Sequence, residues 1–300
     1  MTNRFNFTGL WQHADFMNLW VGETISLLGS QITAIGLPLT AALILEATPE
    51  QMGILGAAEF LPFLLVGLFA GVWVDRRQRK PILMLSDLGR AILIATIPIA
   101  ALMHSLRIEQ LYVVGFLTGV LTVFFDVAYQ SYLPSLVGRA DLVEGNSKLE
   151  VSRSVTQIAG PGVAGTLIHV FTAPLAMVLD SLSYLVSAAF LSRIQTTEPP
   201  PVSSENRHML IEIREGLAVV LQNQTLRSIA ACTSTSNLFG SITQAVFILY
   251  VTRELKLDAV ALGFIFGVAS IGGLLGAVAN ASIVKRIGPG RTIIGGMIFS

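Results

Sequence analysis

A cluster of charges between two long apolar runs constrains the fold of this chain more than any other feature. Residues 71–80 read Gly-Val-Trp-Val-Asp-Arg-Arg-Gln-Arg-Lys and contain four cations. The runs on either side, Met52–Trp73 and Pro81–Met103, are each long enough to cross the hydrocarbon core of a bilayer, whereas cations are costly inside it. The sequence therefore predicts a tight turn at a membrane face between two spanning helices.

The composition agrees with a membrane protein. Hydrophobic residues make up 53% of the 300 residues and charged residues only 13%, about half the charged fraction of an ordinary soluble domain. The formal net charge is zero and does not point to nucleic acid. Cys232 is the single cysteine, which excludes an intrachain disulfide, and no metal site is indicated.

Runs of about 20 apolar residues predict spanning helices along the whole chain. They lie at Phe16–Leu43, Gln51–Trp73, Pro81–Met103, Gln110–Tyr129, Val151–Phe171, Leu175–Leu191, Ser228–Val251 and Ala259–Val284. A further run starts at Thr292 and stops at Ser300, too short to cross a bilayer. We therefore expect eight full spans and the beginning of a ninth.

The positions of lysine and arginine predict the orientation, because these residues resist translocation more than acids do. With the N-terminus inside, the inner loops collect nearly all of them. Only Arg107, Arg253 and Lys256 fall outside, and Arg90 lies within a span. We therefore expect a multi-pass membrane protein with a cytoplasmic N-terminus.

One long polar stretch, Gln195–Gln224, interrupts the spans and contains three consecutive prolines. It predicts a cytoplasmic linker. Its second part, Met209–Leu221, predicts either a helix lying along the membrane surface or an extension of the seventh span. The expected parts are a six-helix bundle at 1–193, a linker at 194–224 and the incomplete start of a second bundle at 225–300.

Similar segments on the two sides of this linker indicate an internal repeat. Three pairs match at separations of 210 or 211 residues: Ser26–Ser30 with Asn237–Ser241, Met52-Gly53 with Leu262-Gly263, and the basic turn at Arg76 with that at Arg286. The chain is therefore predicted to be an all-helical membrane protein built from two parallel copies of a six-helix unit, the second truncated.

This organisation resembles the major facilitator superfamily of transporters. The turn at 71–80 is similar to the family signature between the second and third helices, with Gln78 where the family usually has glycine. Gly160–Gly165 is similar to a Gly-Pro motif of members that export by antiport. The segments 128–134, 145–147 and 159–161 resemble the subgroup of bacterial enterobactin exporters and macrolide efflux pumps.

The resemblance implies a secondary transporter of the bacterial inner membrane that exports an amphipathic small molecule, such as a drug, macrolide or siderophore, by proton antiport with alternating access. It implies no cofactor beyond the proton gradient, and as partners only the bilayer, the substrate and protons, with a monomeric chain. An uptake permease or symporter on the same fold remains the alternative. A membrane-embedded enzyme would need clustered catalytic side chains, and the four histidines are scattered.

The signature also implies a conformational latch. Asp75 would accept hydrogen bonds from a helix N-terminus in the opposite half, and Arg76 and Arg79 would pair with acids on the third and fourth helices. The full set is Gly71, Asp75, Arg76, Arg79, Lys80, Asp87 and Asp126. The alternative for the cations is a positive-inside anchor. In the antiporter-like motif, Gly160, Pro161 and Gly165 would allow close helix packing.

Ionisable side chains inside spans are costly unless they face a cavity or a partner. A carboxylic acid in an apolar cavity favours its neutral form, so it can take up and release a proton near neutral pH. The candidates for proton coupling are Glu23, Glu59 and Asp180. For each of them, the alternative is a satisfied structural contact.

Glu23, Ser26, Ser30 and Thr33 recur at steps of three or four residues in the first span. This spacing predicts a polar stripe on one side of the helix, which we expect to line the central cavity. The candidates for substrate contact are Ser26, Ser30, Gln31, Asn237, Ser241 and Gln244.

Overall fold

The computed structural model describes residues 9–138, 140–198 and 209–288, with residues 290, 292 and 295. Every element in this part of the chain is helical. In order, the elements are η1 Gly9–Gln12, α1 Ala14–Leu39, the π-helix η2 Thr40–Ile44, α2 Pro49–Asp75, α3 Arg79–Leu102, α4 Ile108–Val137, α5 Leu142–Phe171, α6 Ala173–Arg193, α7 Met209–Gln222, α8 Gln224–Leu249, the π-helix η3 Tyr250–Glu254 and α9 Ala259–Ile287.

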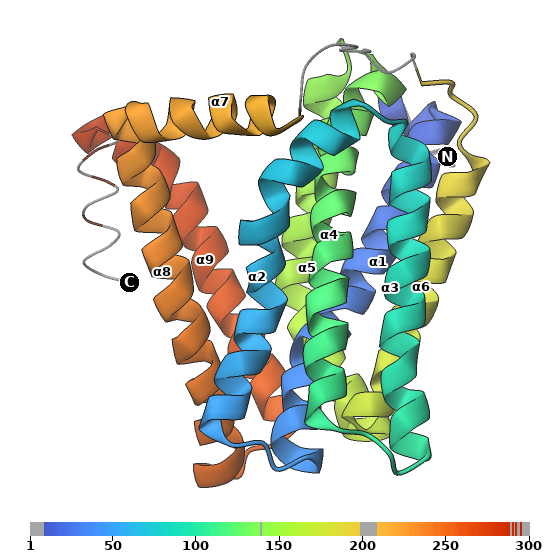
Figure 1. Cartoon of the computed structure of the whole chain (residues 1–300), viewed down its shortest axis with the longest axis vertical. Helices are drawn as coiled ribbons and strands as arrows, with labels where there is room; N and C mark the ends of the chain where they lie inside the picture. The colour runs from blue at the N-terminus through green and yellow to red at the C-terminus, as the bar shows by residue number, and fades with distance from the viewer. Residues whose placement is uncertain are drawn as a thin grey trace, which may run out of the picture.

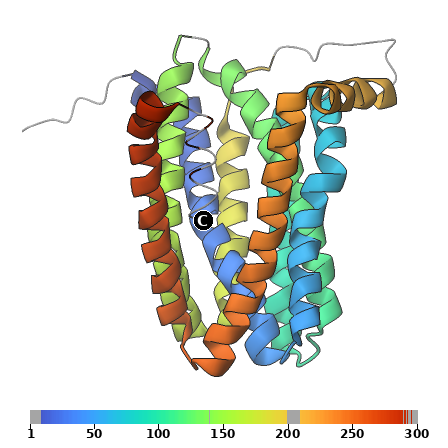
Figure 2. The same cartoon turned by 90° about the vertical axis from the view of Figure 1, so that its left-hand side faces the viewer.

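The long helices stand side by side in one bundle, and α7 lies across its end (Figure 1). Helix α1 packs on α5 and α6, α2 on α4, and α3 on α4 and α6. Helices α8 and α9 attach to this set at two places, α8 beside α2 and α9 beside α5, as the second view makes plain (Figure 2). The eight predicted runs correspond to α1–α6, α8 and α9.

Five of the described helices are long and apolar enough to cross a bilayer: α1 with η2, α2, α3, α4 and α6. Helices α5 and α8 have 30 and 26 residues but are more polar than these five. In α9, the apolar stretch that could be assessed, Ala259–Gly273, is shorter than a full span. The protein is therefore membrane-embedded, whereas spanning by α5, α8 and α9 stays a prediction.

The predicted turn at the charge cluster is confirmed, since α2 ends at Asp75 and α3 begins at Arg79. The start of α2 follows from its sequence. Thr48 Oγ1 accepts from the Gln51 N–H at 3.3 Å, Gln51 Oε1 accepts from the Thr48 N–H at 2.8 Å, and Pro49 occupies the first turn. This reciprocal cap satisfies two backbone donors that have no partner within the helix.

Helix α7 is separate from α8, and its predicted position along the membrane surface stays a prediction. Asn223 Oδ1 accepts from the backbone N–H groups of Thr225 and Leu226 at 3.0 and 3.1 Å, and so caps the start of α8. The chain bends there, and α7 lies across the end of the bundle while α8 runs along it (Figure 1). The segment is thus not an extension of α8.

The described elements repeat at a separation of 210 residues. The bounds of α1 and η2, Ala14–Ile44, recur in α8 and η3, Gln224–Glu254. The turns that follow contain Glu46 and Lys256, which have nearly equal positive φ values of 50° and 51°. This left-handed conformation is uncommon for residues other than glycine, so its recurrence at the same separation is a strong sign of repeated structure.

The turns gather at two ends of the bundle. The basic end contains the turn between α2 and α3, the start of α1, residues 194–198 and α7 (Figure 1). The opposite end contains the turns after η2, α3, α5 and η3. Arg139, Arg207 and Arg291 lie outside the described residues, as do the side chains of Lys285 and Arg286.

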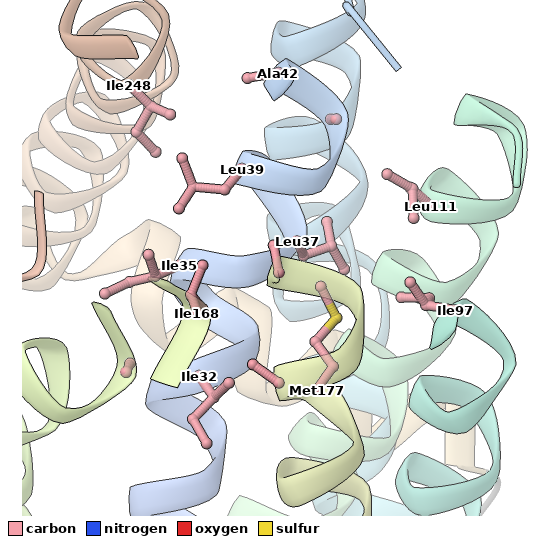
Figure 3. Packing of buried hydrophobic residues seen from close by; sticks show 14 of the residues in the cluster. Ile32, Ile35, Leu37, Leu39, Ala42, Ile97, Leu111, Ile168, Met177 and Ile248 are labelled. Carbon is pink, nitrogen blue, oxygen red and sulfur yellow. The ribbon is translucent and has the colours of Figure 1, made fainter. Parts of the chain in front are cut away.

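A cluster of buried apolar side chains closes the opposite end. It includes Leu39 of α1, Ile168 of α5 and Ile248 of α8. In Figure 3, Leu39 extends from α1 toward the helix that carries Ile248. Val251 of η3 and Ala41 of η2 are fully buried in the same cluster. The two π-helices are therefore part of the seal between α1 and α8.

Two polar contacts lie beside this cluster and also join the two repeats. Arg253 Nη2 donates to the carbonyl oxygen of Ala47 at 2.7 Å. His169 Nδ1, in the last turn of α5, lies 3.5 Å from Asp258 Oδ2. The opposite end is thus held shut by packing and by hydrogen bonding.

Candidate functional site

A cavity with a volume of about 510 Å³ lies at mid-height between the two repeats. Its polar lining includes Gln31 of α1, Gln157 of α5, Gln244 of α8 and Ser270 of α9. Among the predicted substrate contacts, Gln31 and Gln244 therefore face a cavity. Such a mixed polar and apolar lining is typical of small-molecule sites.

A second cavity, with a volume of about 400 Å³, lies nearer the basic end between α1, α4 and α5. Its charged lining consists of Glu23, Asp126, Glu150 and Arg153. Glu150 is in the lining of both cavities, so they lie next to each other along α5. We call the second one the acidic cavity.

Glu23 is the most buried carboxylate of the acidic cavity, with 7% of its surface exposed. Its Oε2 atom has no hydrogen-bond partner in the described part of the chain. The charged groups whose fields reach it are Asp87 and Arg90 from α3, Asp126 from α4 and Arg153 from α5. Glu23 thus has the location expected of a group that exchanges a proton or binds a cation.

The rest of the predicted stripe on α1 is not part of the lining of the two cavities described. Ser30 Oγ lies 2.8 Å from the hydroxyl of Tyr184 on α6, Thr33 Oγ1 donates to Asp180, and Ser26 is buried and donates to the carbonyl of Glu23. Ser30 and Thr33 thus contact α6, whereas Ser26 bonds within its own helix. A substrate contact of Ser26 or Ser30 stays a prediction.

Close packing against α6 explains why that face of α1 turns inward. A Cβ built on Gly29 would lie 2.6 Å from Asp180 Oδ1, and Gly22 and Gly36 approach α6 in the same way. Small residues at such a crossing let backbones come together. The cavity is lined instead by the adjoining face, which carries Glu23, Leu27 and Gln31.

Asp180, the third candidate for proton coupling, is fully buried and away from the cavities described. Its carboxylate accepts from Thr33 Oγ1 and from Ser183 Oγ, the latter at 3.2 Å. Glu59 differs, since it lines a small cavity of about 60 Å³ together with Gln244. Glu23 and Glu59 therefore face cavities. The hydrogen bonds of Asp180 instead fit the alternative reading of a structural contact.

Arg90 and Asp87 form a buried ion pair in α3. Arg90 Nη2 lies 2.5 Å from Asp87 Oδ1, and the side chains are 6% and 0% exposed. The guanidinium carbon also lies over the rings of Phe125 and Tyr184, 4.4 and 4.3 Å from their centroids. Two cation–π contacts thus stabilise the cation in an apolar interior.

Within the basic turn, Arg79 and Lys80 contact an acid that was not among the predicted partners. Glu198, after α6, accepts from the backbone N–H groups of Arg79 and Lys80 at 2.8 and 2.7 Å, and Arg79 Nη1 lies 3.9 Å from its carboxylate. Asp87 is taken by Arg90, so it does not pair with Arg79. The carboxylate of Glu198 lies at the positive end of the α3 dipole, which explains its position.

Three other predicted latch residues, Gly71, Asp75 and Lys80, make no hydrogen bond or ion pair with the second repeat in the described part of the chain. Asp75 ends α2, is exposed, and has no hydrogen bond or ion pair to the described residues. Gly71 has open space around its Cα. Lys80 Nζ donates to the carbonyl oxygens of Ser192 and Ile194 at 3.1 and 2.6 Å. The role of Asp75 stays a prediction.

The antiporter-like motif lies where α5 crosses α9. A Cβ built on Gly165 would overlap the carbonyl oxygen of Ala259 and come within 3.2 Å of the Cα of Gly263. A Cβ on Gly263 would overlap the carbonyl oxygen of Pro161. Gly160, on the neighbouring face, accommodates the side chain of Gln31. The motif therefore brings two backbones into direct contact between the repeats.

Sequence reasoning missed Glu150, Arg153 and Gln157 as cavity residues. They follow one another on α5 at steps of three and four residues, a spacing that predicts one helix face. The signal was present, but the predicted span began at Val151, whereas α5 begins at Leu142. Of the remaining predicted contacts, Asn237 is exposed on α8, and the side chain of Ser241 lies outside the described residues.

Comparison with known proteins agrees with this geometry. The family model described as Major Facilitator Superfamily matches residues 19–300. The chain is 29% identical over 281 residues to "Multidrug efflux pump Tap" of Mycolicibacterium fortuitum, covering 90% of this chain and 67% of that protein. It is 28% identical over 215 residues to "Macrolide efflux protein A" of Streptococcus pyogenes, covering 70% of this chain and 52% of that protein.

A third relative is "Enterobactin exporter EntS" of Escherichia coli O1:K1 / APEC, 22% identical over 296 residues, which cover 96% of this chain and 68% of that protein. The chain thus spans from about half to about two thirds of the length of these relatives.

Proposed function

This chain belongs to the major facilitator superfamily, and we propose that within it the protein exports an amphipathic small molecule, of the drug, macrolide or siderophore kind, by exchange with protons. Members of the family are transporters and not enzymes. The proposed driving force is the proton gradient across the bacterial inner membrane, with the N-terminus cytoplasmic. The proposed unit is a monomer with a first bundle at 1–193, a linker at 194–224 and a second bundle from 225.

One observation carries this proposal: a cavity lies at mid-height between the repeats and the acidic cavity lies toward the basic end, while the opposite end is closed. A basic end is retained on the cytoplasmic side of bacterial membranes. The cavities would then be accessible to substrate from the cytoplasm. Opening of the seal at η2 and η3 would release it outside, as in alternating access by two rocking halves.

Glu23 is the proposed proton-coupling group, in preference to Glu59 and Asp180. It is buried, faces the acidic cavity and has an oxygen without a partner in the described part. A proton on Glu23 removes a charge from the cavity wall, so proton binding and substrate binding affect each other through the same group. Names of the relatives such as "Multidrug efflux pump" support export as the direction.

Transport into everted membrane vesicles tests this function. Vesicles containing the full-length protein are energised to an acid interior, in potassium with valinomycin so that no membrane potential remains. Labelled cationic, neutral and anionic amphipathic probes are tested in turn. We expect at least one probe to accumulate inside the vesicles, and this accumulation to be lost when a protonophore is added. Glu23→Gln should lower gradient-driven accumulation at least about tenfold, since it cannot carry the proton.

The matched control is Glu109→Gln, an exposed acid in the first turn of α4 at the opposite end. This variant should transport like the wild type. Accumulation driven by the reverse gradient would make the protein an uptake permease, and undiminished coupling in Glu23→Gln would remove Glu23 from the mechanism.

A further inference from the structure

The closed end of the bundle, opposite the basic end, has a pair of side chains that joins the two repeats and includes a histidine. His169 Nδ1, in the last turn of α5, lies 3.5 Å from Oδ2 of Asp258, which directly precedes α9. The side chains are 57% and 54% exposed, so protons of the adjoining water can reach them. Histidine is the side chain whose charge ordinarily changes between pH 5 and 8. The attraction between the two side chains therefore depends on the pH at this end.

Asp258 is held in place by a second set of contacts. Its Oδ1 atom accepts from the Ala261 N–H at 2.9 Å, and its carbonyl oxygen accepts from the Leu262 N–H at 3.1 Å. Asp258 therefore caps the start of α9, and its other carboxylate oxygen is the one near His169. An exposed ion pair is usually weak because two mobile side chains must be ordered. Here the cap has already ordered one of them.

The pair lies at the rim of the contacts that close this end. The residues next to its two members, Ile168 and Ala259, are buried in the apolar cluster, in which Figure 3 labels Ile168. Gly165, one helical turn before His169, touches the α9 backbone. Separation of α5 from α9 at this end would expose the cluster and break the pair together. The pair thus belongs to the closed conformation alone.

Asp258 is the acid that the described residues place in contact with His169. The parts of α1 and α6 that reach this end, Ile32–Leu39 and Ala173–Leu179, contain no titratable side chain. The other charged side chains of the neighbouring elements are Arg253, Glu254 and Lys256 around η3 and Arg107 and Glu109 at the start of α4. Within the described part, none of these forms an ion pair with His169, and Arg253 donates to Ala47.

We propose that His169 and Asp258 form a pH sensor that stabilises the closed conformation of this end. When His169 is protonated, it pairs with Asp258 and holds α5 against α9. When it is neutral, the attraction is lost and the two helices separate more readily. The inference rests on the proposed function only for the side that this end faces, which would be the outside. An acidic exterior would then favour the conformation whose cavities load from the basic end.

Distances between spin labels across the closed end test the sensor. Nitroxides are attached at His104→Cys in the first repeat and at Leu255→Cys in the second, both exposed, in the full-length Cys232→Ala protein in nanodiscs. Double electron–electron resonance at pH 5 and pH 8 gives the ratio of closed to open molecules. At pH 5 we expect His169→Asn to lower this ratio about two- to fivefold, the range typical of exposed ion pairs. At pH 8 this variant should have no effect.

Comparison of variants at the same pH cancels the titration of other groups such as Glu23. His169→Lys is charged at both pH values and should favour the closed end at both. Asp258→Asn keeps a side-chain oxygen that can cap α9 but has no charge, and in this background both changes at His169 should lose their effect. A ratio unchanged by His169→Asn at pH 5, or an undiminished effect of His169→Lys in the Asp258→Asn background, would overturn the proposal.

Failure of the sensor and failure of the proposed function are distinguishable, because this measurement needs neither a gradient nor a substrate. A closed end that responds to His169, without proton-driven export, would contradict only the export function. Proton-driven export by a protein whose closed end ignores the charge of His169 would contradict only the sensor.

Discussion

Replacement of Gly165 by leucine is expected to abolish transport. At this position the α5 backbone touches the carbonyl oxygen of Ala259 and the Cα of Gly263 in α9, so even one methyl group would overlap backbone atoms. Backbone cannot move away as a side chain can, and α5 must separate from α9 along their whole crossing. The cost of such overpacking is on the order of 3 kcal/mol.

That cost falls on a contact between the two repeats, and not on the interior of either one. A change of about 3 kcal/mol alters the balance between conformations about a hundredfold. We therefore expect Gly165→Leu to insert into the membrane in normal amounts while its transport in everted vesicles falls to background. Gly263→Leu, on the other side of the crossing, should behave in the same way.

The matched control is Gly162→Leu on the same helix. Gly162 has no described atom within 4 Å of a built Cβ, so a side chain there meets open space. This variant should transport normally. Equal transport by Gly165→Leu and Gly162→Leu would mean that the α5–α9 crossing does not control the conformational equilibrium.

The second large effect is expected from Asp87→Asn. This change leaves Arg90 as a buried cation without its anion, although the rings of Phe125 and Tyr184 remain. Removal of one partner from a buried ion pair costs about 3–5 kcal/mol, whereas removal of both partners is often nearly neutral. We expect the midpoint of thermal unfolding in detergent to fall strongly for Asp87→Asn.

A double variant separates charge from packing. Asp87→Leu with Arg90→Met removes both charges and keeps apolar volume, and it should recover most of the lost thermal stability. Asp180→Asn is the control, because one of the hydroxyls of Thr33 and Ser183 can still donate to the amide oxygen and the other can accept from the amide N–H. A wild-type midpoint for Asp87→Asn, or no recovery in the double variant, would contradict a stabilising role for this pair.

Much of the fold could be predicted because lipid restricts what a sequence can do. Backbone polar groups in the hydrocarbon core must be satisfied within the chain, so apolar runs become helices. Charges such as those of Arg76–Lys80 then mark the turns. The 210-residue repeat predicted from the sequence recurs in the structure, where the turns that follow η2 and η3 adopt the same unusual φ.

The side of α1 that faces the cavity could not be predicted from polar residues alone. Ser26, Ser30 and Thr33 share a stripe with Glu23, but one edge of this stripe lies against α6 and the other against the cavity. Ser30 and Thr33 contact α6. The spacing of Gly22, Gly29 and Gly36 by seven residues was the stronger signal. Small residues at that spacing identify the tightly packed face and leave the adjoining face for the cavity.

The partners of the basic turn were also beyond sequence reasoning. Glu198 lies within the predicted linker, more than a hundred positions from Arg79, and nothing local indicates that it returns to cap α3. Asp15 fixes the same stretch by accepting from the backbone N–H groups of Gln195 and Thr196 at 3.0 and 2.8 Å. Such long-range contacts depend on the assembled bundle and not on periodicity.

Export by this route depends most directly on which end of the bundle faces the cytoplasm, and single-cysteine labelling measures this. In a Cys232→Ala background of the full-length protein, cysteines are introduced at exposed turn positions. Gln78→Cys reports on the basic end, and Glu46→Cys and His104→Cys report on the opposite end. Intact cells are treated with a membrane-impermeant maleimide before and after permeabilisation.

We expect the cysteines at positions 46 and 104 to be labelled in intact cells and the one at position 78 only after permeabilisation. Labelling of position 78 from outside, with positions 46 and 104 protected, would put the closed end in the cytoplasm and contradict export through cavities that load from the basic end.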